Sequence, residues 1–166
     1  MVFISIGVFP VSVKLGRSQN KVCQSGLVER RGAHCVHSLG YHLVWCTKYR
    51  HSVLVGEPYL FVKHLLTQIC QANDFGLVAL EVMPDHVHLF VQLDPCDLVP
   101  DVVRLFKSTT AVAVFSQFPE LKGKRFWGSG LWSRGYFVST VGKLDEGVVK
   151  RYVDEQQCKP YRVSHD

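Results

Sequence analysis

The sequence lacks the features that mark several common classes of protein. It has six cysteines but no C-x-x-C pair, which argues against a zinc ribbon or a disulfide scaffold and fits a reducing cytosol. No apolar run is long enough to span a bilayer, and the apolar opening MVFISIGVFPVSVKLGR has neither a basic n-region nor a small-residue cleavage site. We therefore expect a soluble, cytoplasmic protein.

Acidic side chains are also in short supply relative to basic ones. The 166 residues include 19 Lys and Arg but 14 Asp and Glu, giving a formal net charge of +5. This modest excess favours a polyanionic partner over an acidic small molecule. The length suits a single domain with a proper core. We predict a domain over residues 34–159, after an N-terminal extension of unclear role (1–33) and before a short tail (160–166).

The hydrophobic pattern predicts four strands and three helices from His34 onward. The expected strands are 41–50, 77–83, 86–93 and 131–141. Helices are expected in 56–76, with Pro58 in the first turn, in 94–118, with Asp97 as N-cap and Pro100 in the first turn, and over about 144–157. The basic segment 119–130 is expected to be a loop. The first six elements follow the β-α-β-β-α-β order of ferredoxin-like domains, so we predict an α+β fold with an additional C-terminal helix.

The strand 86–93 carries two histidines on one face. Successive strand side chains alternate between faces, so an apolar stripe lies opposite His86 and His88; it is formed by Val87, Leu89, Val91 and Leu93. In a ferredoxin-like sheet the stripe lies under the helices and the histidines look out from the open face. Two such imidazoles can converge on one metal ion. A bare His-x-His is a weak signal, however, and two half-exposed histidines are the alternative.

The last predicted helix brings two further polar side chains. Tyr152 and Gln156 are four residues apart, and therefore lie on one helix face. The amide oxygen can complete a two-histidine site without adding charge, and the phenol can act as a nucleophile beside a cation. The alternative is that Tyr152 packs the helix onto the sheet. Spacing alone leaves the two interpretations even.

Several motifs in the same order resemble one family. HVH within MPDHVHLF, together with YHLVWCTKYR, LWSRGYFVSTVG and YVDEQ, resembles the single-tyrosine HUH transposases of the IS200-like group, over residues 32–159. The resemblance implies that His86, His88 and Gln156 bind a divalent cation, Mg²⁺ or Mn²⁺. It implies that Tyr152 attacks single-stranded DNA and forms a 5′-phosphotyrosine link. This chain has some thirty residues before the first family strand, a departure from the family pattern.

The resemblance also implies partners. Family members grip imperfect hairpins at the ends of the mobile DNA, and act as homodimers whose sheets are joined and whose sites are shared between subunits. Whether Tyr152 would act in its own subunit or in the partner stays open, since Gly142 suits either a flexible connection or an ordinary turn. A prokaryotic, nucleoid-associated location follows from the same resemblance.

DNA contacts are predicted for a set of basic side chains that could line a path for phosphates: Lys107, Lys122, Lys124, Arg125 and Arg134. Trp127 and Trp132 either stack on unpaired bases or belong to the core. Surface or satisfied-core roles are expected for the remaining histidines of the domain, which are His34, His37, His42, His51 and His64.

Three other functions are compatible with parts of the pattern. An RRM-like module would bind single-stranded nucleic acid without cleavage, but its aromatic motif is absent and His86 and His88 stand on the strand that would carry it. A relaxase or replication initiator shares the HUH chemistry but typically needs further domains. A zinc hydrolase is disfavoured because no third histidine or carboxylate stands at a convincing spacing.

Overall fold

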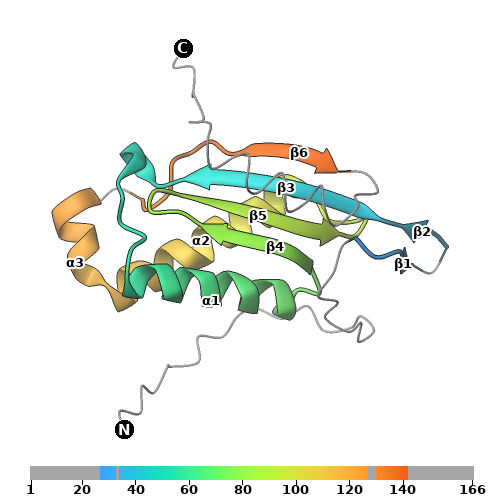
Figure 1. The fold of residues 1–166 in the computed structure, drawn as a ribbon, viewed down its shortest axis with the longest axis horizontal. Coiled ribbons are helices and arrows are strands. Elements are labelled where there is room, and N and C mark those ends of the chain that lie inside the picture. The colour runs from blue at the N-terminus through green and yellow to red at the C-terminus, as the bar shows by residue number, and fades with distance from the viewer. Residues whose placement is uncertain (1–26, 33, 127–129, 142–166) are drawn as a thin grey trace, which may run out of the picture.

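A four-stranded antiparallel sheet forms the centre of the protein. The structure, a computed structural model, describes residues 27–32, 34–126 and 130–141. The sheet has the order β4-β5-β3-β6 (Figure 1). Its strands are β3 (Leu39–Cys46), β4 (Gly76–Val82), β5 (His86–Leu93) and β6 (Phe137–Val141). With helices between them along the chain, the fold is a mixed α+β fold, as predicted.

Two long helices begin as the sequence indicated. The first helix, α1 (Glu57–Ala72), and the second, α2 (Val99–Gln117), each have proline in the first turn, where its missing N–H goes unneeded. The predicted N-cap of α2 is wrong. Leu98 occupies the cap position, and the Asp97 carboxylate instead accepts the Asp94 backbone N–H at 3.0 Å. Asp97 therefore closes the turn between β5 and α2.

The apolar stripe of β5 lies in the core, as predicted. Val87, Leu89, Val91 and Leu93 are fully buried, in one cluster with buried side chains of α1 and α2. Fully burying an aliphatic side chain of this size contributes about 1.5–3 kcal/mol. The helices therefore fix which face of β5 is the core face, and His86 and His88 lie on the opposite face.

Three segments differ from the sequence-based expectations. The strand predicted to reach Arg50 ends at Cys46, and a 3-10 turn, η1 (Lys48–Arg50), follows. Segment 119–130 is not simply a loop, because it contains the short helical turns α3 (Pro119–Leu121) and η2 (Lys122–Phe126). The strand predicted from Leu131 begins only at Phe137. Before it, Trp132 makes an isolated bridge to Thr47.

A two-stranded hairpin precedes the sheet. Its strands, β1 (Arg30–Arg31) and β2 (Val36–His37), pair antiparallel beyond the ends of β3 and β5 (Figure 1). The predicted helix 144–157 and residues 1–26 of the predicted extension lie outside the described residues. Within the described ranges, no helix combines the length and the hydropathy that a membrane span requires.

Candidate metal centre

His86 and His88 lie side by side at the start of β5. Their rings are 4.9 Å apart between centroids and nearly perpendicular, at 74°. Across the sheet, Cys46 and Val44 of β3 pair with the two histidines, and Glu81 of β4 pairs with His88. Both histidines are partly buried. The strand alternation that predicted a shared face is confirmed by this register.

The Nδ1 atom of His86 is held by a carboxylate. It lies 2.5 Å from Asp85 Oδ1, while Arg50 donates to Asp85 Oδ2 from Nε at 2.9 Å and from Nη2 at 2.8 Å. Burial raises the pKa of Asp85, but the hydrogen bonds and charges of His86 and Arg50 outweigh burial and hold that pKa below its usual value. Asp85 is therefore an ionised acceptor at neutral pH, and the proton resides on His86 Nδ1.

The Nδ1 atom of His88 is held by another imidazole. It lies 3.2 Å from His42 Nε2, and the two rings stack at 5.4 Å. Burial lowers the pKa of His42. The pKa of His88 falls to about 4 through burial first, and then through the charges of His86 and His42. His88 is neutral at neutral pH, which is the form that binds a metal ion.

The two histidines fit a metal site of a particular kind. Because each Nδ1 is engaged by a protein partner, Nε2 is the ring nitrogen left to each histidine as a ligand atom. Metal-bound histidines in proteins commonly donate the other ring N–H in this way. Within residues 27–32, 34–126 and 130–141, no group of three or more His, Cys, Asp or Glu side chains could hold a metal ion. Among these residues, a third protein ligand would have to be of a different residue type.

The other predicted members of the site cannot be placed. Tyr152 and Gln156 lie outside the described residues, so their roles stay predictions. Gln156, the predicted third ligand, has a neutral amide oxygen, a ligand type that suits Mg²⁺ or Mn²⁺. The two described histidines and this amide would leave positions open for substrate oxygens.

Three residues of the site were missed in the sequence. Asp85 had no predicted functional role, Arg50 stood at the end of a predicted strand, and His42 was expected to be a surface or core histidine. The contact of Arg50 with Asp85 spans 35 positions, and no local pattern signals it. His42 could have been found only from the strand register, which pairs it with Phe90 and places it diagonally beside His88.

Lys107, predicted to contact DNA, binds the chain itself. Its ammonium group donates to the backbone carbonyls of Ser133 at 2.7 Å, Arg134 at 3.0 Å and Gly135 at 3.2 Å. Burial lowers the pKa of Lys107, partly offset by Cys46. These contacts give Lys107 a structural role in fixing the segment before β6. Its contact with DNA stays a prediction.

The other predicted DNA-binding residues lie on the surface or beyond the described atoms. Lys122 is exposed, with its ammonium 5.9 Å from the Phe115 ring centroid, and Arg134 is exposed. The side chains of Lys124 and Arg125 are outside the described part of the structure. DNA contacts by these four residues stay predictions.

Trp132 belongs to the core rather than to an exposed base-stacking surface. It is 7% exposed, and its indole Nε1 donates to Thr110 Oγ1 at 2.9 Å. Of the two roles that the sequence left open, the core role is confirmed for this residue. Trp127 lies outside the described residues. His34 and His64 are exposed, as predicted.

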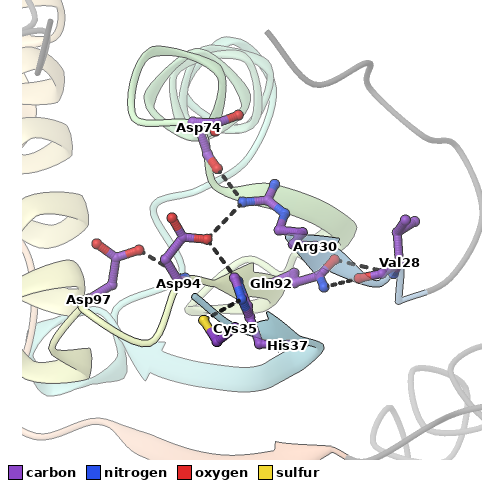
Figure 2. A network of polar contacts seen from close by, with 8 residues as sticks. All are labelled: Val28, Arg30, Cys35, His37, Asp74, Gln92, Asp94 and Asp97. Atoms are coloured by element: carbon purple, nitrogen blue, oxygen red, sulfur yellow. Dashed lines mark hydrogen bonds and ion pairs between the residues drawn. The ribbon is translucent and has the colours of Figure 1, made fainter. Parts of the chain in front are cut away.

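A second polar network occupies the opposite end of β5 (Figure 2). There Asp94 Oδ1 lies 3.0 Å from His37 Nε2 and 3.5 Å from Arg30 Nη1. The Gln92 amide group accepts from the Val28 backbone N–H at 3.2 Å and donates to the Val28 carbonyl. This network ties residues 28–37 to the sheet.

Comparisons with known proteins agree on one group. The sequence matches the model of the family described as transposase IS200 like over residues 35–156. It is 39% identical over 130 residues to the ISDra2 transposase TnpA of Deinococcus radiodurans, covering 78% of this chain and 92% of that protein. It is 29% identical over 128 residues to a transposase for insertion sequence element IS200 of Salmonella typhimurium, covering 77% and 83%.

Solved structures give the same result. A crystal structure provisionally named a transposase, from Deinococcus radiodurans R1, matches with a TM-score of 0.64 and 42% identity, covering 76% of this chain and 97% of that one. A REP-associated tyrosine transposase bound to a REP hairpin matches with a TM-score of 0.51 at 15% identity, covering 84% and 69%. The second likeness concerns the fold alone.

Proposed function

The chain belongs to the family of IS200-like transposases, and from this premise we propose that it cleaves and rejoins single-stranded DNA through a tyrosine nucleophile. One observation carries the proposal: His86 and His88 share a sheet face, with each Nδ1 engaged and each Nε2 left as a ligand atom. The order and pairing of strands support placing the domain among ferredoxin-like folds. We also propose an additional C-terminal helix, which would carry Tyr152.

The histidine pair would hold Mg²⁺ or Mn²⁺ together with Gln156. When bound, such a cation supplies a positive charge that polarises and orients the scissile phosphate. The protein contributes the fixed geometry: His86 is oriented by Asp85, and His88 by His42. Because two imidazoles and an amide bring no negative charge, the site remains attractive to a phosphodiester.

Tyr152 would perform the covalent step. Its phenolate oxygen attacks the phosphorus, a tyrosine–phosphate bond forms, and the bond to the 3′-oxygen breaks. The phenol proton has passed to solvent, and the 3′-oxygen takes up a proton from solvent and leaves as a free hydroxyl. Because the phosphate ester is conserved on Tyr152, a later attack by a 3′-hydroxyl can rejoin strands without ATP.

The DNA and the assembly follow from the same proposal. The REP-associated transposase was solved with a hairpin, and we propose that this chain also recognises hairpins, at the ends of its mobile DNA. We further propose a homodimer in which sheets join at an edge. The edge strands are β4 and β6, and β6 exposes Phe137 and Val138 by 37% and 40%.

A covalent-adduct assay tests the chemistry. A labelled single-stranded oligonucleotide carrying a hairpin end is incubated with the protein and Mg²⁺ or Mn²⁺, and the adduct is resolved on a denaturing gel. Tyr152→Phe should abolish the adduct while retaining DNA binding. Tyr161→Phe is the matched control, because it removes another C-terminal phenol, and should retain the adduct. An adduct that persists with Tyr152→Phe contradicts the assignment.

Mixing variants tests whether the sites are shared. His86→Ala and Tyr152→Phe subunits should each be inactive alone. If each site combines the tyrosine of one subunit with the histidines of the other, a mixed dimer contains one intact site. It should then recover part of the adduct yield. Absence of recovery in verified mixed dimers places the tyrosine with the histidines of its own subunit.

A further inference from the structure

Asp85 connects the histidine pair to a distant segment of the chain. Its carboxylate bonds His86 through Oδ1 and Arg50 through Oδ2. Its backbone carbonyl accepts from the Thr47 backbone N–H at 2.8 Å and lies 3.2 Å from Thr47 Oγ1. Asp85 is thus fixed both through its main chain and through its side chain.

The segment that fixes Asp85 is itself tightly constrained. Thr47 is fully buried, and its Oγ1 lies 2.8 Å from the His51 carbonyl. Between them Tyr49 and Arg50 have φ values of 61° and 53°, a left-handed conformation that side chains disfavour. Leu54 then donates its backbone N–H to the Pro84 carbonyl at 2.9 Å. The strained turn at residues 48–50 is therefore held on both sides, by Thr47 before it and Leu54 after it. Both bond to the turn at Pro84 and Asp85 that precedes His86.

Strain of this kind persists where surrounding structure imposes it, and it gathers at functional sites. In this strained turn, two nitrogens of the Arg50 guanidinium contact Asp85 Oδ2. The other carboxylate oxygen, Oδ1, is left to bond His86. An ordinary surface ion pair forms without a strained backbone or a buried segment that holds it in place. Arg104 and Asp101 also meet at 2.8 Å, but they are three residues apart on one helix and exposed by 75% and 57%.

We propose that Arg50 and Asp85 are a positioning pair that fixes the ring of His86 with its proton on Nδ1 and its Nε2 available to the cation. The inference deepens the proposed metal site and rests on it. Neither residue touches the cation or the DNA in this scheme; both act through His86. Removing a partner of this type usually lowers metal affinity or activity about 10–100-fold.

Metal binding without DNA provides the first test. Mn²⁺ is titrated into the full-length protein and followed by electron paramagnetic resonance. Asp85→Ala should weaken binding about 10–100-fold, Arg50→Ala should weaken it less, and Asp101→Ala should leave it unchanged. Circular dichroism establishes that each variant is folded. His86→Ala serves as the reference for loss of the site.

The tautomer provides a second test that needs no metal. In ¹⁵N-resolved nuclear magnetic resonance of the metal-free protein, at a pH where the ring is neutral, His86 should carry its proton on Nδ1. Asp85→Ala should shift the proton towards Nε2, whereas Asp85→Asn, which keeps an acceptor oxygen, should restore part of the Nδ1 form. A role in folding alone would move neither signal in a folded variant.

The outcomes distinguish failure of the Arg50–Asp85 positioning role from failure of the metal site itself. If His86→Ala loses Mn²⁺ binding but folded Asp85→Ala retains it within twofold, with an unchanged tautomer, the positioning pair is overturned and the metal site stands. If the unaltered protein binds no Mn²⁺, or His86→Ala binds it equally well, the metal site fails and the positioning role fails with it.

Discussion

The two ends of β5 contain the same three kinds of side chain in different arrangements. At the start of the strand, Asp85 binds Arg50 and His86; just past its end, Asp94 binds Arg30 and His37. The histidine nitrogen that meets the carboxylate differs. It is Nδ1 in His86 and Nε2 in His37. An arginine, an aspartate and a histidine in contact are therefore not a functional signature by themselves.

The neighbours of the two Arg-Asp-His sets differ. His86 has a second imidazole beside it, with its own Nδ1 engaged by His42. His37 instead directs Nδ1 towards the Cys35 thiol at 3.8 Å, and Arg30 also donates to the Asp74 carbonyl at 2.8 Å (Figure 2). In the proposed metal site the first set would orient a ligand, whereas the second fastens chain segments to one another.

The sharpest way to break this comparison is to delete one histidine at each end. His86→Ala should lower the rate of DNA cleavage by more than about 100-fold, beyond the usual loss of an outer partner, because a metal ligand is removed. His37→Ala should leave cleavage nearly unchanged but lower the free energy of unfolding by about 1–3 kcal/mol, because a partly buried carboxylate loses a partner.

Single-turnover cleavage and urea denaturation of both variants measure these effects. A folded His37→Ala protein with the same catalytic loss as His86→Ala would erase the distinction between the two ends.

A smaller effect, on stability alone, is expected from replacing Gln92, which belongs to the network at the far end of β5. Gln92 is 3% exposed, and its amide satisfies both the N–H and the carbonyl of Val28. Gln92→Leu should lower the free energy of unfolding by about 1–3 kcal/mol because these groups lose their partner. Mn²⁺ affinity should not change. Exposed Gln68→Leu is the matched control, and an unchanged unfolding curve for Gln92→Leu contradicts the fastening role.

A further effect on stability is expected only when the pH is lowered. The pKa of His88 is lowered to about 4, so the folded protein resists a proton that an unfolded chain takes up below about 6.5. Metal-free stability should therefore be fully present above pH 6.5 and decline as the pH falls towards 4.

Denaturation at several pH values in EDTA measures this decline, and His88→Gln should flatten it. Exposed His64→Gln should not. A decline of equal slope in His88→Gln would assign the pH dependence to other groups.

The regular parts of the fold could be predicted because short-range patterns determine them. The alternation of residues 86–93 gave both the buried stripe and the histidine face, and proline in the first turn marked the start of each long helix. The strand end at Cys46 was missed because Lys48, Tyr49 and Arg50 have ordinary strand propensity. Their turn is imposed by contacts with residues 84 and 85, far along the chain.

The site was predictable to the same extent as the fold: its local features could be predicted, and its long-range contacts could not. The His-x-His spacing and its surrounding motifs pointed to His86 and His88, since both are local features. The residues that orient them are not local: His42 needs the register of β3 against β5, and Arg50 needs the strained turn. A sequence names ligand types readily, but the proton position on each ring depends on tertiary contacts.

The left-handed turn at Tyr49 and Arg50 has a consequence for engineering. Glycine adopts a left-handed backbone more readily than tyrosine does, so a screen that rewards heat resistance alone should favour glycine at position 49, where the Arg50–Asp85 contacts are not directly removed. Such a gain would loosen the hold on the Arg50 guanidinium. Thermal robustness and DNA processing should therefore be selected together, because improvement of the first by this route erodes the second.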